Sequence, residues 1–283
     1  MYRWIAVAAA LAGALLFGMS AVAEQQGTKQ VKTRQALSPR ILLDLMRQPV
    51  WVVGVGGLIA GFALQVTALH FGSLALVQPL LVGDLVFAVL IGAYQRRRGD
   101  VVVFAGVAAC TAGVVGFLAV AKPSGGHPDD SLGTFLPLAA CYCSAVAVCL
   151  VMAYGHRALR PPALALATGI SYGTTAFLIK LLTTDASVAH VFTTWPLYAV
   201  AIVAPLGFVL NQDAYQRGTM VAPVLAIITI TDPLVSILLA GALLSERLAH
   251  SPPAIAGEVV SLALMIAGVF VVAYRSPQAK PAR

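Results

Sequence analysis

Long runs of apolar residues fill nearly the whole of this 283-residue chain, and they restrict it to one class of fold. A helix that crosses the hydrocarbon core of a bilayer needs about 20 consecutive apolar residues. The chain is therefore predicted to be an all-α integral membrane protein with about nine transmembrane helices. We place these helices at roughly 4–23, 50–70, 73–95, 101–121, 133–154, 161–182, 192–211, 219–244 and 254–274.

The composition favours a protein embedded in lipid over a soluble one. Hydrophobic residues make up 59% of the chain and charged residues 10%, and the mean hydropathy is +0.88. A soluble domain keeps about a quarter of its residues charged. The net charge of +7 is interpreted as loop charge that orients the helices, not as a nucleic-acid binding surface. The expected partners are the lipid bilayer and a small-molecule or ion substrate, with no nucleic acid.

Basic residues gather in alternate connections between the predicted helices, and this pattern predicts the orientation of the chain. Cytoplasmic connections of membrane proteins carry an excess of Lys and Arg. The N-terminus is therefore predicted to lie outside and the C-terminus in the cytoplasm, in a multi-pass protein of the plasma membrane. The basic residues on the predicted cytoplasmic side are Lys29, Lys32, Arg34, Arg40, Arg47, Arg96, Arg97, Arg98, Arg157, Arg160, Arg217, Arg275, Lys280 and Arg283.

The first apolar run also has features of a secretory signal peptide. Ala21-Val22-Ala23 satisfies the small-residue rule for cleavage, and Arg3 supplies a short basic start. Cleavage after Ala23 would leave stretch 24–48 and every other basic connection outside, against the charge rule throughout. We therefore predict that the N-terminal helix is retained as a transmembrane helix.

Similarity between the two parts of the chain gives a second reason to retain the first helix. Three pairs of segments match at equal or nearly equal spacing, so that the first four helices resemble the last four. A signal peptide would have no reason to resemble a later helix. The pairs are GFALQVTALHFG (61–72) with GFVLNQDAYQRG (207–218), VGDLVFAVLIGA (82–93) with ITDPLVSILLAGA (230–242), and FGMSA (17–21) with YGTTA (172–176).

A single helix separates the two similar parts. Because four helices return the chain to its starting side, the fifth carries it across, and the second repeat starts from the opposite side. Inverted repeats of this kind are common in secondary transporters. We divide the chain into repeat 1 at 1–122, a linker helix with its loops at 123–160, repeat 2 at 161–274 and a cytoplasmic tail at 275–283.

Two of the predicted helices carry the pattern of a known family. They contain LALVQPLLVGDLVFAVLIG and APVLAIITITDPLVSILLAGALLSERL, and FGMSAVAEQQG ends the first helix. In these segments the chain resembles the EamA-like group of the drug/metabolite transporter superfamily. The helix count and orientation also resemble the NIPA-type magnesium transporters within it. The resemblance implies export of a small metabolite or drug, coupled to protons. The common family form has ten helices, and we find no tenth here.

An aspartate lies near the middle of each of two helices that the repeats pair, Asp84 in the third and Asp232 in the eighth. An acidic side chain at the bilayer centre costs about 2.5–3.5 kcal/mol on insertion scales, so such residues often have a function. An in-plane two-fold axis would bring both to one central cavity. We interpret them as substrate-, proton- or cation-binding residues. The structural alternative for each is a hydrogen bond to a neighbouring helix.

Prolines within helices, and polar residues near them, supply the other candidates. Proline removes an N–H donor and frees a carbonyl, and in membranes freed carbonyls often line a cavity. Kinking for packing is the alternative. The predicted helix breaks are Pro79, Pro223 and Pro233, and the further binding candidates are Gln78, Thr229 and Thr231 beside them, Gln65 and Asn211 at equivalent positions, and Tyr172 and Thr175. Glu24 is expected at the interface or at a mouth, and Lys180 is expected to snorkel to the interface.

Motifs that would indicate an enzyme are absent from the sequence. There is no G-x-x-x-x-G-K-[ST] phosphate loop, and no H-E-x-x-H or G-x-S-x-G pattern. We predict no enzymatic activity, no cofactor and no metal site, unless Asp84 and Asp232 bind a cation as substrate.

The expected function is secondary active transport of a small metabolite or drug across the plasma membrane, coupled to protons and working by alternating access. The first alternative is a magnesium or other divalent-cation transporter of the NIPA type, since carboxylate, carbonyl and hydroxyl oxygens suit magnesium. The second is a membrane scaffold or accessory subunit that transports nothing, in which the midplane acids support assembly.

Overall fold

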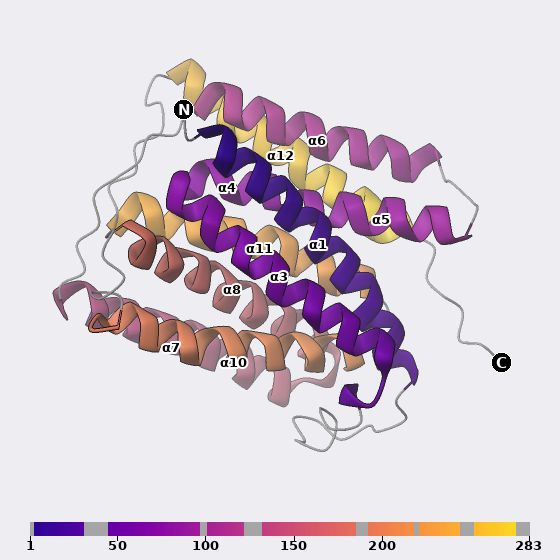
Figure 1. Ribbon diagram of the computed structural model, residues 1–283, viewed down its shortest axis with the longest axis horizontal. Coiled ribbons are helices and arrows are strands. Elements are labelled where there is room, and N and C mark those ends of the chain that lie inside the picture. Colours follow the sequence, from indigo (N-terminus) through magenta and orange to yellow (C-terminus); the bar gives the residue numbers. More distant parts are fainter. Residues whose placement is uncertain are drawn as a thin grey trace.

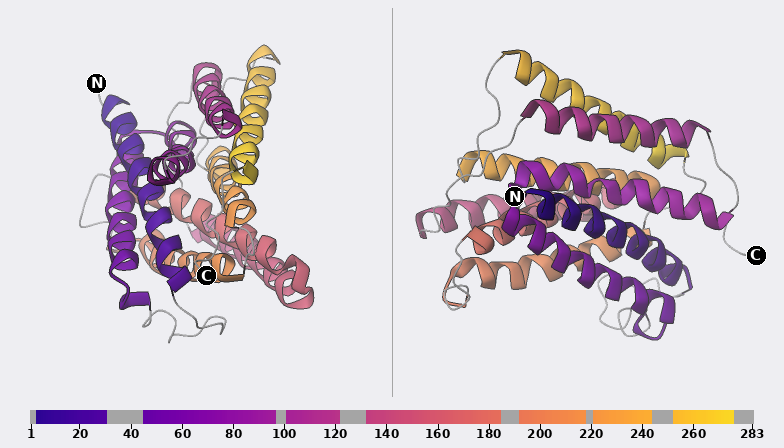
Figure 2. Two further views of the ribbon diagram at one scale, coloured as in Figure 1. Left: turned by 90° about the vertical axis from the view of Figure 1, so that its right-hand side faces the viewer. Right: turned by 45° about the horizontal axis from the view of Figure 1, so that its top comes forward.

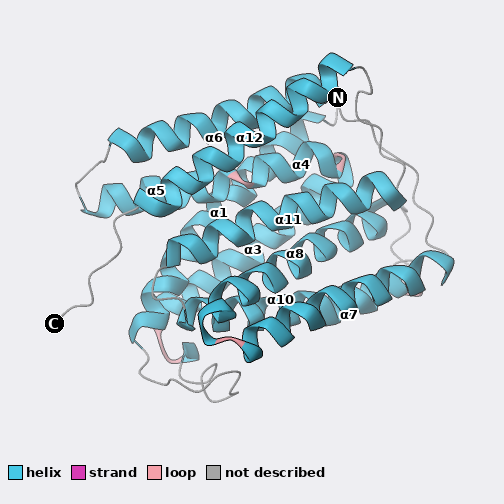
Figure 3. Ribbon diagram, turned by 180° about the vertical axis from the view of Figure 1, so that it is seen from behind, coloured by secondary structure: helices cyan, strands magenta, loops and turns pink. Residues whose placement is uncertain are grey.

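Helices account for all the regular structure in the part of the chain that the computed structural model describes, which comprises residues 3–30, 45–96, 101–121, 132–184, 192–217, 221–243 and 252–275 (Figure 3). In chain order the elements are α1 (Arg3–Gln30), α3 (Pro49–Phe71), α4 (Leu74–Leu81), α5 (Gly83–Arg96), α6 (Val101–Ala121), α7 (Leu132–Gly155), the 3₁₀ turn η1 (Arg157–Leu159), α8 (Arg160–Thr184), α10 (Trp195–Arg217), α11 (Val221–Leu243) and α12 (Pro252–Arg275).

Seven helical segments are long and apolar enough to cross a membrane. Two further helices contain shorter apolar segments, Phe104–Phe117 in α6 and Ile227–Leu243 in α11. The expected all-helical, multi-pass membrane protein is confirmed at this level. The seven spans are Arg3–Glu24, Pro49–Phe71, Leu74–Ile91, Leu136–Gly155, Arg160–Thr183, Trp195–Tyr215 and Pro253–Val271.

The largest difference from the predicted elements is a break in the helix expected over 73–95. The chain forms α4 and α5 there, with Val82 between them. Pro79 has no N–H to donate, and Gly83 is a weak helix former, so the helix is poorly stabilised at this point. Neither effect changes the run of apolar residues, so the hydropathy pattern predicted one continuous helix. Two helices are also longer than predicted: α1 continues to Gln30 and α10 to Arg217.

Many of the basic residues that predict the orientation lie outside the described residues. They include Lys32, Arg34 and Arg40 of the first connection and Arg97 and Arg98 after α5. The expected tail at 275–283 is described only at Arg275.

Helix α8 lies in the middle of the bundle (Figure 1). Its apolar span is 78% buried, far more than that of any other long span. Helices α1 and α3 pack along one another, and α6 and α12 run side by side at one edge (Figure 2). A central helix can be buried in this way because small residues such as Ala163, Ala165 and Ala167 let its neighbours approach closely.

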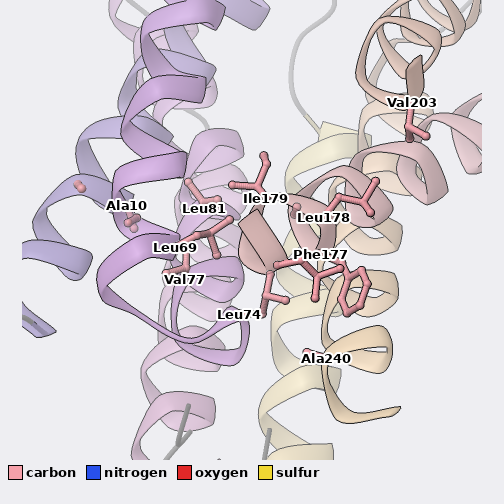
Figure 4. Packing of buried hydrophobic residues seen from close by; sticks show 14 of the residues in the cluster. Ala10, Leu69, Leu74, Val77, Leu81, Phe177, Leu178, Ile179, Val203 and Ala240 are labelled. Carbon is pink, nitrogen blue, oxygen red and sulfur yellow. The ribbon is translucent and has the colours of Figure 1, made fainter. Parts of the chain in front are cut away.

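The main buried cluster joins the first helices of the chain to the later ones. Phe177, Leu178 and Ile179 of α8 lie among apolar side chains of α1, α3, α4, α10 and α11 (Figure 4). Burying a side chain of this size stabilises by about 1.5–3 kcal/mol relative to leaving it in water. The partners shown are Ala10, Leu69, Leu74, Val77, Leu81, Val203 and Ala240.

Close helix contacts at glycine recur in the two parts of the chain. A Cβ atom on Gly18 of α1 would lie 2.5 Å from the carbonyl oxygen of Asp84. One on Gly173 of α8 would lie 2.5 Å from the carbonyl oxygen of Asp232. Each of these helices therefore lies directly against the turn that carries an aspartate, and no larger residue fits there without a shift.

Helices α6 and α12 also pack closely at glycine, and each helix supplies one of the two glycines. A Cβ atom on Gly113 would lie 2.6 Å from the backbone nitrogen of Met265, and one on Gly268 would lie 2.5 Å from that of Cys110. In each helix the contacted residue precedes that helix's own glycine by three positions. The two helices thus approach each other through equivalent contacts, as small residues allow in membrane helices.

Candidate functional site

A cavity of about 480 Å³ lies inside the bundle. Helices α1, α3, α4 and α5 form one part of its wall, and α8, α10 and α11 form the rest. The volume falls in the range of about 300–1,000 Å³ that is usual for small-molecule pockets. Most of the lining is apolar, and its larger side chains are Phe17, Leu58, Phe62, Leu81, Phe208 and Ile228.

All but one of the binding candidates picked from the sequence line this cavity. Segments that are far apart in the chain contribute them, and no local motif would have joined them. The exception is Thr231, which packs against α8, where a Cβ atom on Gly169 would lie 2.5 Å from the Thr231 Cβ. The lining candidates are Gln65, Gln78, Asp84, Tyr172, Thr175, Asn211, Thr229 and Asp232.

The three predicted helix breaks have different positions. Pro233 lies inside α11 and lines the cavity. It cannot donate to the carbonyl of Thr229 one turn earlier, and Thr229 is also part of the wall. Pro79 lies inside α4, next to the break, but not in the cavity wall. Pro223 lies near the start of the described part of α11, which runs from Val221, so the break expected there stays a prediction. The side chain of Pro223 lies outside the described part.

The two aspartates differ in their surroundings. Asp84 lies in the first turn of α5, and its Oδ1 accepts a hydrogen bond from the N–H of Leu85. Helix N-termini favour negative charge, so the position of Asp84 at the start of α5 stabilises its ionised carboxylate. Asp232 lies within α11, and its Oδ1 has no hydrogen-bond partner among the described residues. Both side chains are only partly buried because they face the cavity.

A polar cluster of neutral groups lies near these acids. The amide of Asn211 lies beside the hydroxyl groups of Tyr172 and Tyr215. Within the described part of the chain, the Tyr172 hydroxyl, Asn211 Oδ1 and Gln78 Nε2 make no hydrogen bond. Buried polar atoms usually have a partner in the protein or in bound water. These three atoms therefore lack the partner that buried polar atoms usually have.

Glu24, expected at the interface or at a mouth, also lines the cavity. It is 3% exposed, because α1 does not end near residue 23 but continues past it. The Ser20 hydroxyl lies 2.9 Å from Glu24 Oε1 and 2.6 Å from the carbonyl oxygen of Gly54. From α10, Gln212 Nε2 donates to Glu24 Oε2 at 2.8 Å. We call this group of four residues the Glu24 junction.

Counting hydrogens at the Glu24 junction indicates a protonated acid. A serine hydroxyl has one hydrogen to donate, and a carbonyl oxygen can only accept. Ser20 therefore cannot make a full hydrogen bond to Gly54 and another to an ionised Glu24, and would have to share its one hydrogen between them. If Glu24 carries a proton, its O–H donates to the Ser20 oxygen while Ser20 donates to Gly54. This arrangement satisfies every contact in the junction at once.

Lys180 forms a second polar contact between the two parts of the chain. It was expected to reach the interface, but it is only 8% exposed. Its Nζ donates to the carbonyl oxygens of Leu69 at 2.8 Å and of Gly72 at 2.7 Å. Basic side chains stabilise the last carbonyls of helices in this way. We call this contact of α8 with the C-terminal end of α3 the Lys180 junction.

Two residues of the cavity wall, one on α3 and one on α10, are exposed. They are Ile59 of α3 and Pro205 of α10, and Ile59 is exposed to 65%. The two helices meet nearer one end, where the rings of Trp51 and Phe208 have centroids 6.4 Å apart. Both exposed residues lie in apolar spans.

The described residues of the cavity wall include three acidic side chains, Glu24, Asp84 and Asp232, and no basic one. Among the described residues, no three His, Cys, Asp or Glu side chains are gathered closely enough to hold a metal ion. The cavity therefore combines an apolar wall with acidic groups.

Comparison with known proteins finds similarity along most of the chain but no function. An uncharacterized protein of Corynebacterium glutamicum is 26% identical over 251 residues, which cover 86% of each protein. No family model and no solved structure matches the chain. The chemistry of the cavity is therefore the guide to function.

Proposed function

We propose that this protein is a secondary active transporter of the drug/metabolite transporter superfamily that moves a small metabolite or drug across the plasma membrane. The observation that carries the proposal is the meeting of Asp84 and Asp232, from separate parts of the chain, in one cavity of drug-sized volume. Acidic residues within membrane spans commonly mark substrate and proton paths. Proton coupling through these carboxyls is part of the proposal.

The proposed architecture is nine spanning helices in two inverted four-helix repeats joined by α7, with the N-terminus outside and the C-terminus in the cytoplasm. The recurring glycine contacts support it. Gly18 and Gly173 occupy matched positions in the sequence repeats, and each lies against the aspartate of its own repeat. The reciprocal contacts of Gly113 and Gly268 are those that a two-fold axis between α6 and α12 would produce.

Alternating access would use the two polar junctions. The Glu24 junction joins α1 to α10, and the Lys180 junction joins α8 to α3, so each ties one repeat to the other. Loosening one junction while the other stays closed would open the cavity to one side of the membrane. Alternating access of this kind is largely the rocking of one repeat against the other around a fixed site.

The apolar wall favours an organic substrate over a hydrated metal ion. Magnesium demands about six oxygen ligands in a regular geometry and gives up its water reluctantly. Large side chains such as Phe17, Phe62 and Phe208 offer it none. Selective, saturable uptake of magnesium, the NIPA-type alternative, is therefore an outcome of the test and not the proposal.

The test compares cells that express the wild-type protein, the double variant Asp84→Asn/Asp232→Asn, or Gly56→Ala. Gly56 is the matched control because it is exposed and a Cβ atom there meets nothing within 4 Å. We expect at least one compound to be released into the medium by the wild type and by Gly56→Ala but not by the double variant. The same compound should then cross proteoliposomes of the purified protein when a proton gradient is imposed.

Equal release by the wild type and the double variant, at equal amounts of folded protein, would contradict the proposal. Transport of magnesium alone would support the divalent-cation alternative. A double variant that fails to assemble, with no flux through wild-type proteoliposomes, would support the scaffold alternative.

A further inference from the structure

The corner between α7 and α8 gathers positive charge that the proposed transport cycle does not use. His156, Arg157 and Arg160 fall within five consecutive residues. Arg157 begins the 3₁₀ turn η1, and Arg160 is the first residue of α8. No acidic residue occurs in the sequence of α7, η1 or α8, and no described acidic side chain elsewhere forms an ion pair with either arginine. The two charges are therefore not balanced within the described part of the chain.

Backbone hydrogen bonds fix the two arginines close together. The N–H of His156 donates to the carbonyl of Met152 at 3.2 Å, and the N–H of Leu159 donates to the carbonyl of His156 at 3.0 Å. The N–H of Arg160 donates in turn to the carbonyl of Arg157. In a 3₁₀ turn, side chains three positions apart lie one above the other. Arg157 and Arg160 have this spacing, so both side chains start from the same side of the corner.

The ring of Tyr154 holds the guanidinium group of Arg160. Its centroid lies 4.7 Å from Arg160 Cζ, a distance at which a ring face attracts a cation. The Nε atom of Arg160 is buried but has no hydrogen-bond partner among the described residues. Buried donors usually have a partner, so this arginine is positioned while its hydrogen bonding is incomplete. Guanidinium groups bind phosphate through two parallel hydrogen bonds, and such a group would supply what is missing.

The place of the corner in the chain indicates where a phosphate would come from. The apolar span Leu136–Gly155 ends just before the corner, and the span Arg160–Thr183 begins at it. Residues 156–159 therefore join two spans at one surface of the bilayer, at the level of the lipid headgroups. On α7, one to two turns before the corner, Val148 and Val151 are exposed to 59% and 72%. They offer an apolar face to acyl chains beside the basic corner.

We propose that the corner between α7 and α8 binds an anionic phospholipid, with the headgroup phosphate on Arg157 and Arg160 and the acyl chains along α7. A free phosphate ion has the same chemistry at the arginines, but it would leave the exposed face of α7 unused. Helix α7 packs mainly against α8, so a lipid bound to both sides of the corner would hold α7 to the bundle. The inference does not depend on transport, because this lipid stays bound outside the cavity.

The test counts the lipids bound to the full-length protein in neutral detergent by native mass spectrometry. The probes are phosphatidylglycerol, phosphatidylcholine with the same acyl chains, and inorganic phosphate as a competitor. We expect one phosphatidylglycerol to bind at least about tenfold more tightly than phosphatidylcholine. Arg157→Gln/Arg160→Gln should remove this preference, as loss of charge-assisted hydrogen bonds would. Arg47→Gln is the matched control, since Arg47 is an exposed arginine just before another span, Pro49–Phe71.

Further variants keep the test decisive if the glutamine double variant folds poorly. Arg157→Lys/Arg160→Lys keeps both charges but loses the planar fork of arginine, and we expect it to lose part of the preference. Tyr154→Leu removes the ring beside Arg160, whereas Tyr154→Phe keeps it. Phosphatidylglycerol should therefore bind more weakly to Tyr154→Leu than to Tyr154→Phe.

Equal binding of phosphatidylglycerol and phosphatidylcholine would overturn the site, as would a preference that survives in both arginine double variants. Inorganic phosphate that binds as tightly as phosphatidylglycerol would overturn the lipid as its occupant. An equal loss of preference in Arg47→Gln would show attraction to surface charge in general, and would overturn the corner as a distinct site.

Discussion

Helices α1 and α8 each join the two parts of the chain through a buried side chain near the helix end, and the two contacts differ in their chemistry. Each helix carries a buried ionisable side chain that reaches into the other part of the chain, Glu24 to Gln212 and Lys180 to the end of α3. When FGMSA is aligned with YGTTA, Glu24 and Lys180 lie one residue apart. The positions are therefore nearly equivalent, but the chemistry is opposite.

The partners of the two residues explain how the junctions should behave. Lys180 binds backbone carbonyls at a helix C-terminus, which cannot turn away and whose dipole favours a cation. Glu24 binds the side-chain amide of Gln212 and the hydroxyl of Ser20, both of which can rotate. We therefore expect the Lys180 junction to be the firmer contact and the Glu24 junction the one that opens more easily.

The largest expected effect comes from removing the firmer contact. Lys180→Met keeps most of the length of the side chain but loses two hydrogen bonds from a charged donor, each worth about 1.5–3 kcal/mol. We expect the free energy of unfolding in detergent to fall by about 3 kcal/mol, measured as a lower thermal midpoint. Leu166→Met on the same helix is the control, since Leu166 is 38% exposed. A loss no greater than that of Leu166→Met would show that the junction contributes little.

A smaller effect tests whether the two parts of the chain are built alike. Gly18→Ala and Gly173→Ala each force a methyl group against a backbone carbonyl, and overpacking of this kind costs about 1–3 kcal/mol. The two losses should be similar, because the two contacts are. Gly56→Ala in α3 and Gly241→Ala in α11 are matched controls with nothing within 4 Å. They should raise the thermal midpoint, since alanine favours a helix by about 1 kcal/mol over glycine. Unequal losses at Gly18 and Gly173 would contradict equivalence.

Several polar residues of the cavity wall could be picked from the sequence, because a polar side chain in an apolar run is conspicuous, but Ser20, Glu24 and Tyr215 were missed. Asp84 and Asp232 are costly in lipid, and the internal similarity paired Gln65 with Asn211. Helix geometry explains the one exception. Successive residues turn by about 100° around a helix, so the four α11 residues of the wall, Ile228, Thr229, Asp232 and Pro233, lie on one face. Thr231 falls outside that face.

The two junctions could not be predicted, because hydropathy does not show where a helix ends or what meets it. The apolar run of the first helix stops near residue 23, but α1 continues to Gln30 and carries Glu24 into the bundle. The partners of Lys180 lie more than a hundred residues away in the sequence. Only the packing of α8 against α3 brings them together, and no local pattern records that contact.

The smallest expected effect tests the proton on Glu24. A glutamine has nearly the shape of a protonated glutamate: its carbonyl oxygen can accept from Gln212, and its amide can donate to Ser20. Glu24→Gln should therefore change the free energy of unfolding by less than about 0.5 kcal/mol, within the usual effect of a neutral substitution. It should also remove a protonated carboxyl band from the infrared spectrum of the resting protein.

An ionised Glu24 would give a different result in the same measurements. If Glu24 is ionised in the closed junction, Glu24→Gln loses hydrogen bonds to a charged acceptor and destabilises by about 1.5–3 kcal/mol, with no band lost. Glu24→Ala supplies the reference, because it leaves Gln212 Nε2 without its acceptor in either case. If Glu24 releases its proton, Ser20 can no longer keep both a full hydrogen bond to Glu24 and one to Gly54. That loss would make the Glu24 junction open on deprotonation, while the Lys180 junction between α8 and α3 stays closed.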